Sequence, residues 1–310
     1  MKIVPLQEIL LEKYEAQKNV PQIQYHANGD CVHIGKISPA CAACFRNKQE
    51  SFSIYVGYQC PLQCPMCYYH ELRDDEFTLE VARKEKEGLI ELYKKSLSPD
   101  FKPKYISFNS CGESLLYLDQ YEKYADIIKR IEDERRINIY KHIYTSGYNA
   151  SQKDLRRLKN MRINEIRFHF TATCSDQVLD IIHEAKTMGF RTTIEEPAWP
   201  LHTDILLNTL PKFNSIGIDI LNMVEVQVTF NNIKKIESLY PNGRIYRNAL
   251  YHLYHEGMTY QIMNEVVKNC HFSVLDCNSD VERYRRVDCQ NYQMEDDLND
   301  ACAEHSFNQR

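Results

Sequence analysis

Three cysteines lie close together in the segment QCPLQCPMC, at positions 60, 64 and 67. Thiolates are soft ligands that select iron–sulfur clusters or zinc, and a short loop brings three of them together at little entropic cost. Three thiolates can hold three irons of a 4Fe–4S cluster and leave the fourth iron open. Zinc takes a fourth ligand, for which Tyr69 and His70 are the closest candidates along the loop.

The elements around this loop alternate between predicted strands and helices. A strand over residues 51–57 leads directly into the loop. Such alternation predicts parallel strands joined by helical crossovers, whose functional residues gather at the carboxyl ends of the strands. The cysteines follow the first strand, where this rule expects them. The later strands are expected over 104–110, 138–146, 164–172, 190–198 and part of 215–229, and the helices over 78–97, 119–135, 151–161, 175–189 and 204–212.

In its cysteine spacing and its place after the first strand, the chain resembles the radical S-adenosylmethionine (SAM) superfamily. The resemblance implies an α/β fold, a partial (β/α)6 parallel barrel of the radical SAM type with short N- and C-terminal extensions. We expect an N-terminal extension over 1–50, the core over 51–230 and a C-terminal helical and strand extension over 231–310.

The same resemblance implies a 4Fe–4S cluster on Cys60, Cys64 and Cys67, whose open iron binds the amino acid end of SAM. Reduction of the cluster would cleave SAM to methionine and a 5′-deoxyadenosyl radical, which abstracts hydrogen from a substrate C–H bond. One departure from the family pattern is Met66, which stands where an aromatic residue usually precedes the third cysteine.

Polar residues at the strand ends are the candidates for binding SAM. Gly112 and Glu113 resemble the family's Gly-Gly-Glu stretch, with Cys111 in place of the first glycine, although such a turn is commonly just a solvated turn. Thr145 and Ser146 resemble its Thr-Asn-Gly turn, and an ordinary glycine turn is the alternative. The further candidates are Ser114, Glu196, Asn222 and the pair Arg167 and His169, which share one face of a strand. The sequence identifies no catalytic residue for the substrate.

A second group of cysteines lies outside the predicted core. Cys41 and Cys44 are separated by two alanines, a spacing typical of a shared metal or a redox pair. With Cys277, and with Cys270 or Cys31, they predict a second site that holds either an iron–sulfur cluster or zinc. Buried thiols without a metal are the alternative.

Composition narrows the class of protein. The chain has 310 residues and a formal net charge of −5, which disfavours general nucleic-acid binding. No apolar run approaches the roughly 18 residues of a membrane span, so no membrane partner is expected. Twelve cysteines in a chain of this size, without a secretory signal pattern, favour reduced thiols in the cytoplasm.

The substrate is predicted less directly than the chemistry. Residues 231–310 lack a dense cysteine pattern, so an open barrel suited to a peptide or protein substrate is expected. A glycyl-radical enzyme activase and a small-molecule radical SAM enzyme are the alternatives within the family. A non-catalytic iron–sulfur or zinc protein is the alternative from another class. Reduction of the cluster calls for a low-potential electron donor such as flavodoxin or ferredoxin.

Overall fold

The computed structural model describes residues 1–26, 31–45, 51–67, 75–247 and 250–277. The chain divides into two compact units. The central unit comprises Pro39–Leu62 and Arg73–Ile194, and the terminal unit comprises Met1–Ser38, Gln63–Leu72 and Glu195–Arg310. Tyr69, His70, Cys289 and Cys302 lie outside the described residues.

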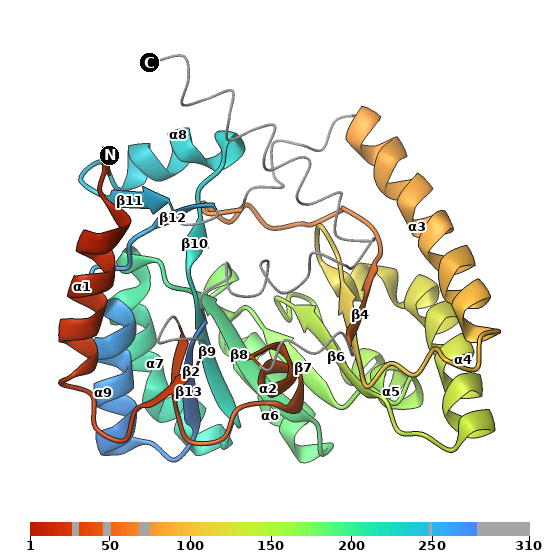
Figure 1. The fold of residues 1–310 in the computed structure, drawn as a ribbon. Coiled ribbons are helices and arrows are strands. Elements are labelled where there is room, and N and C mark those ends of the chain that lie inside the picture. Colours follow the sequence, from red (N-terminus) through yellow and green to blue (C-terminus); the bar gives the residue numbers. More distant parts are fainter. Residues whose placement is uncertain (27–30, 46–50, 68–74, 248–249, 278–310) are drawn as a thin grey trace. The chain divides into compact units, whose positions relative to one another are not determined.

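The central unit is built on parallel strands with helical connections (Figure 1). Each strand pairs in parallel with the next along the chain. The strands are β4 (Ser51–Tyr55), β5 (Tyr105–Asn109), β6 (Tyr140–Thr145), β7 (Glu165–Phe168) and β8 (Arg191–Pro197), whose last three residues belong to the terminal unit. The helices are α2 (Pro39–Phe45), α3 (Asp75–Ser96), α4 (Leu118–Arg135), α5 (Gln152–Asn160) and α6 (Asp176–Thr187), with short 3-10 turns at Ser114–Tyr117 and Phe170–Ala172.

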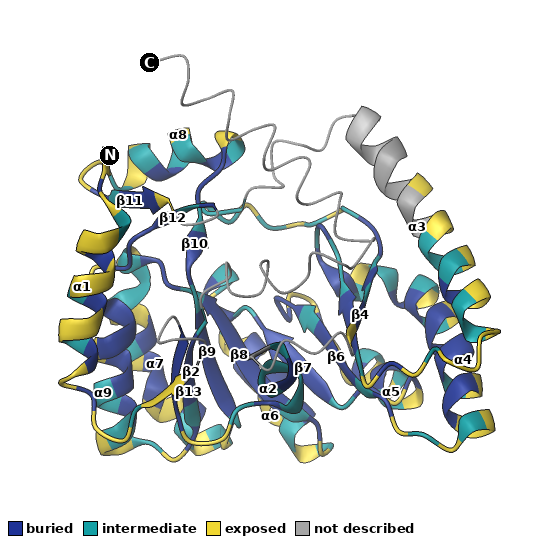
Figure 2. Ribbon diagram, viewed as in Figure 1, coloured by how far each residue is buried: buried dark blue, intermediate teal, exposed yellow. Residues whose placement is uncertain are grey.

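The core of the central unit follows from the apolar residues of these strands. Ile106, Phe108, Ile143 and Ile166 are fully buried, and Figure 2 shows the strands in dark blue beneath helices that expose their outer faces. The strands also bury polar side chains, among them Glu165 and Arg167 on β7. Helix α5 begins at a capping box, in which Ser151 and Asp154 bond each other's backbone.

The terminal unit contains two sheets. In one, β13 (Ser273–Cys277) pairs in parallel with β9 (Ile220–Val224) and antiparallel with β3 (Cys31–Ile34), which pairs with β2 (Gln24–His26). The other has the order β1 (Lys2–Ile3), β11 (Arg244–Arg247), β12 (Tyr251–Leu253) and β10 (Val226–Gln227). The helices are α1 (Leu6–Gln17), α7 (Thr203–Ile216), α8 (Phe230–Leu239) and α9 (Met258–Asn269), and a 3-10 turn covers Pro200–His202.

The structure confirms a mixed α/β fold with parallel strands and helical connections. Helix α7 is longer than the expected helix over 204–212, because it continues to Ile216 and ends at Gly217 in a left-handed conformation. The partial barrel and the division at residues 50 and 230 stay predictions. Within the described part of the chain, no helix is both long enough and apolar enough to cross a bilayer.

Candidate functional site

The cysteine loop follows β4. Cys60, Cys64 and Cys67 are each partly buried, and the backbone N–H of Cys67 donates to the carbonyl of Cys64 at 3.1 Å. The boundary between the units falls after Leu62, so Cys60 belongs to the central unit and the other two cysteines to the terminal unit. No three His, Cys, Asp or Glu side chains among the residues described form a group that could hold a metal ion.

Tyr117 supports the start of this loop within the central unit. Its hydroxyl oxygen accepts the backbone N–H groups of Tyr58 and Gln59, at 3.0 and 2.6 Å. Gly57, with φ at +72°, lies under the Tyr117 ring, and a Cβ at Gly57 would meet that ring at 2.0 Å. Tyr117 therefore fixes the backbone that directly precedes Cys60.

The turn after β5 contacts the same stretch of backbone. The N–H of Glu113 donates to the carbonyl of Gln59 at 2.8 Å, and the N–H of Cys111 donates to that of Gly57 at 3.1 Å. Gly112 lies between them, and a Cβ there would meet the Gln59 oxygen at 2.1 Å. Only glycine permits this close approach. The glycine predicted from the family pattern thus has a steric reason in this fold.

The carboxylate of Glu113 is 3% exposed and joins two strand ends. Its Oε1 accepts the hydroxyl of Thr145 and the N–H of Leu115, and its Oε2 accepts the N–H and the hydroxyl of Ser146. The structure therefore brings together three of the predicted site residues. These four donors occupy the acceptor positions of the carboxylate, so a ligand amino group must share or replace some of them. Gly112 is half-buried and Ser114 is buried beside Glu113.

Arg167 lies in a buried network on β7. Its Nε donates to Glu165 Oε1 at 3.0 Å, its Nη1 contacts the Tyr144 hydroxyl at 3.0 Å and its Nη2 contacts Cys41 Sγ at 3.2 Å. The Tyr144 ring also stacks on His169, with centroids 6.3 Å apart, which agrees with the shared strand face predicted for Arg167 and His169. The guanidinium of Arg167, a candidate for binding SAM, is thus paired with Glu165 in this structure.

Glu165 accepts two further hydrogen bonds in the same network. Thr193 Oγ1 donates to its Oε1 at 2.7 Å and the Tyr140 hydroxyl to its Oε2 at 2.8 Å. Burial of the hydroxyl is the main cause, and the charge of Glu165 the second, that raises the pKa of Tyr140 far above its ordinary value. Tyr140 therefore stays protonated and holds Glu165 as a donor.

Two predicted residues lie in the terminal unit, Glu196 near the end of β8 and Asn222 on β9. Asn222 donates from Nδ2 to Glu195 Oε2 at 2.7 Å, while Asn222 Oδ1 is buried without a hydrogen-bond partner in this unit's described residues. Glu196 is fully buried beside Glu195 in the sequence. The carboxylate that bonds Asn222 is thus Glu195, the sequence neighbour of the predicted Glu196.

The terminal unit also contains a buried ion pair that the sequence did not predict. Lys13 Nζ on α1 pairs with Glu225, which directly follows β9, and lies 3.2 Å from the Tyr246 hydroxyl. Among the described residues nearby, Glu225 Oε2 has no hydrogen-bond partner. Lys13 reads as a surface residue of an amphipathic helix, so only the tertiary structure reveals its partner.

The second cysteine group is spread over the two units. Cys41 and Cys44 lie on α2 in the central unit, whereas Cys31, Cys270 and Cys277 belong to the terminal unit. There, Asp276 of β13 pairs with Val32 of β3, so continuation of the antiparallel register places Cys277 opposite Cys31. Burial raises the pKa of Cys270. The second metal site stays a prediction.

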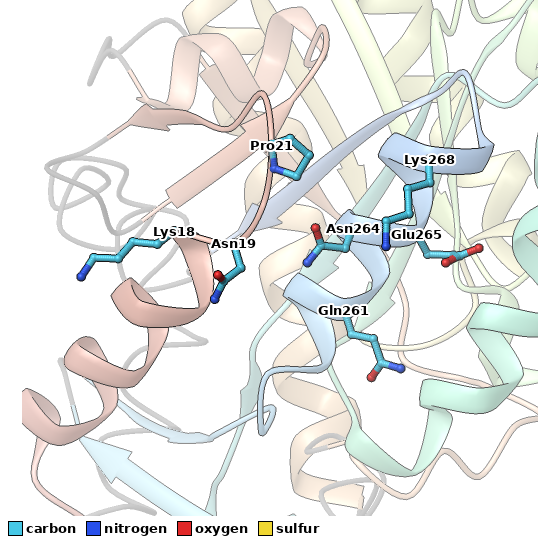
Figure 3. Close-up of a pocket in the computed structure, with 7 residues that line it drawn as sticks. All are labelled: Lys18, Asn19, Pro21, Gln261, Asn264, Glu265 and Lys268. Atoms are coloured by element: carbon cyan, nitrogen blue, oxygen red, sulfur yellow. The ribbon is translucent and has the colours of Figure 1, made fainter.

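A hollow of about 720 Å³ lies in the terminal unit, between the end of α1 and helix α9 (Figure 3). None of the predicted site residues lines it. Its lining residues are Lys18, Asn19, Pro21, Gln261, Asn264, Glu265 and Lys268.

Comparison with known proteins gives no family assignment. No protein-family model and no curated protein sequence matches the chain. Among solved structures, SuiB from Streptococcus suis matches with a TM-score of 0.41 and 12% identity, over 70% of this chain and 50% of its own. The radical S-adenosylmethionine methyltransferase TsrM from Kitasatospora setae matches with a TM-score of 0.38 and 9% identity, over 62% of this chain and 39% of its own.

The oxidase HemN from Escherichia coli, described as a radical SAM enzyme, has a TM-score of 0.37 and 13% identity, over 61% of this chain and 47% of its own. The matches cover half of the length of SuiB, and less than half of the length of TsrM and of HemN. All three scores lie below 0.5, so these likenesses carry no weight for the function.

Proposed function

We propose that this chain is a radical SAM enzyme. One observation carries the proposal: the turn with Gly112 and Glu113 is hydrogen-bonded to the backbone that directly precedes Cys60. Family resemblance assigns these two segments to SAM and to the cluster. Their contact in the central unit supports that assignment, because it brings the two segments together.

Cys60, Cys64 and Cys67 would hold a 4Fe–4S cluster. The donor set fits, since three partly buried thiols on one loop are the ligands that iron–sulfur clusters take, and a fourth thiol on the loop is not required. Reduced by flavodoxin or ferredoxin, the cluster would supply one electron for cleavage of SAM to the 5′-deoxyadenosyl radical. The protein contributes orientation and exclusion of water.

The residues at the strand ends would bind SAM. Glu113 is the acceptor for its amino group, and Thr145 and Ser146 orient this carboxylate. Bonds that now run from Thr145 and Ser146 to Glu113 would be exchanged in part for bonds from the ligand. The remaining proposed contacts are Gly112, Ser114, Arg167, His169, Glu196 and Asn222.

A peptide or protein is the substrate that we favour, and activation of a glycyl-radical enzyme or reaction on a small molecule are the alternatives. Oxygen-sensitive chemistry of this kind suits the reducing cytoplasm. We also propose a second metal site at Cys41, Cys44 and Cys277, which would hold either an iron–sulfur cluster or zinc. Measuring the iron and zinc content of the protein distinguishes the two.

The test is anaerobic reconstitution with iron and sulfide, followed by dithionite and SAM and chromatography for 5′-deoxyadenosine. Wild-type protein should bind about four irons per chain and form deoxyadenosine, and about eight irons would indicate a second cluster. Cys64→Ala should abolish both, whereas Cys174→Ala, which changes an exposed thiol outside the motif, should leave both unchanged. Deoxyadenosine formation that persists in Cys64→Ala refutes the proposal.

A second variant separates SAM binding from cluster binding. Glu113→Gln keeps the size of the side chain but removes the charge that would face the SAM amino group. We expect iron content to stay at the wild-type value while the SAM-induced change in the EPR spectrum is lost. An unchanged EPR response in this variant would remove Glu113 from the SAM site, and loss of iron would instead assign it to the support of the cysteine loop.

A further inference from the structure

The side-chain amide of Asn232 joins two backbone segments of the terminal unit, the cysteine loop and the stretch before α8. Its Nδ2 donates to the carbonyls of Met66 and Gln227, both at 2.9 Å, and its Oδ1 accepts the N–H of Thr229 at 2.8 Å. Asn232 lies in the first turn of α8 and is 1% exposed. Both hydrogens of the amino group and the oxygen are therefore used in a buried place.

Met66, one of the residues held, lies between Cys64 and Cys67. The N–H of Cys67 closes a turn onto the carbonyl of Cys64 at 3.1 Å, so the Met66 peptide is part of that turn. The Met66 side chain packs against a buried apolar cluster that includes Trp199 and Ile236. This segment of the loop is thus fixed through its backbone by Asn232 and through a side chain by the core.

We propose that Asn232 is a positioning residue that sets the direction in which the thiols of Cys64 and Cys67 face their ligand. The inference rests on the proposed function, since it assigns these thiols to the cluster. In this half-buried turn the Met66 carbonyl loses its donor when the amide is removed, and the turn is then free to rearrange. Partners behind the ligating residues commonly determine metal affinity and redox potential. Asn232 would act in this way through the Met66 peptide.

Asn232→Asp is the sharpest variant, because it keeps the shape and the oxygen that accepts the N–H of Thr229. It replaces the donor by an oxygen that faces the carbonyls of Met66 and Gln227. Asn214→Asp is the matched control, since Asn214 Oδ1 likewise accepts a backbone N–H, from His271 at 2.8 Å. Asn232→Ala removes the bonds without adding a charge, and thermal unfolding checks that each variant is folded.

The first measurement is retention of the reconstituted cluster in the presence of an iron chelator, together with its midpoint potential. We expect Asn232→Asp and Asn232→Ala to lose the cluster about tenfold faster than wild type, as substitutions behind metal ligands usually do. The midpoint potential should shift in both. Asn214→Asp should match wild type in both readouts. If both Asn232 variants match it as well, the proposal is wrong.

The second measurement needs no cluster. In metal-free protein, alkylation of Cys64 and Cys67 is followed by mass spectrometry of the peptide that contains them. Both Asn232 variants should react about fivefold faster or more, because the loop opens more often without its anchor. Faster alkylation combined with no cluster in wild type would keep the positioning inference and refute the proposed function. Unchanged alkylation in both Asn232 variants would overturn the inference.

Discussion

The close approach of the Gln59 backbone to Gly112 predicts that one added methyl group at residue 112 lowers the stability of the protein strongly. In Gly112→Ala the new Cβ would lie 2.1 Å from the Gln59 oxygen and 2.6 Å from the Tyr58 oxygen, and both are backbone atoms. Favourable contacts of carbon begin at about 3.5 Å, so the two segments must separate by about 1.4 Å. The bonds that Glu113 and Cys111 donate across this contact would then break.

The cost can be worked out from these losses. Overpacking costs about 1–3 kcal/mol. Each broken hydrogen bond adds about 0.5–1.5 kcal/mol. The free energy of unfolding should therefore fall by about 2–6 kcal/mol, out of the about 5–15 kcal/mol of a typical domain.

Urea unfolding measures this change, and Gly88→Ala is the control. Gly88 lies inside α3, where a Cβ would approach no nearer than 3.4 Å to the Tyr124 hydroxyl. This control should gain about 0.5–1 kcal/mol, because alanine favours the helix. A loss below about 1 kcal/mol in Gly112→Ala would contradict the close approach, since overpacking alone exceeds it.

Three further predictions concern single side chains. Tyr117→Phe leaves two backbone N–H groups without their acceptor and should lower the free energy of unfolding by about 1–3 kcal/mol, measured in urea. Lys13→Met leaves Glu225 buried without its cation and should cost about 3–5 kcal/mol, most of which the added change Glu225→Gln should restore. Burial, followed by the charge of Lys13, holds the pKa of His255 well below its ordinary value, so the folded protein keeps this imidazole neutral. The unfolded chain takes up a proton there below about pH 6.5, and the free energy of unfolding should therefore fall as the pH drops below that value. In His255→Phe the melting temperature should change less between pH 7 and pH 5 than in wild type.

The order of strands and helices could be predicted from the sequence because apolar runs and turn residues mark it locally. The expected strand over 104–110 is β5, and the expected helix over 151–161 is α5. Helix α7 was underestimated by the four residues after 212, since Gly217 in a left-handed conformation, rather than Pro211, marks its end.

The site could be predicted where it consists of strand ends, since parallel strands bring their carboxyl ends together. Glu113 therefore meets Thr145 and Ser146 as expected. The supports of the cysteine loop could not be predicted in this way. Tyr117 bonds Tyr58 and Gln59, which precede it by 59 and 58 positions in the chain. Asn232 bonds Met66, which precedes it by 166 positions. Such contacts leave no periodic trace in the sequence.

The antiparallel pairing of β3 with β13 also orders events during synthesis. The first 38 residues find their strand partners in β11 and β13, so they must wait for about 240 further residues, up to Cys277. At about 5–20 residues per second this delay is roughly 10–50 s, during which the central unit can already fold. Strand β3 is thus among the last strands to pair, and a ribosome stalled before Ser273 would leave β3 without β13.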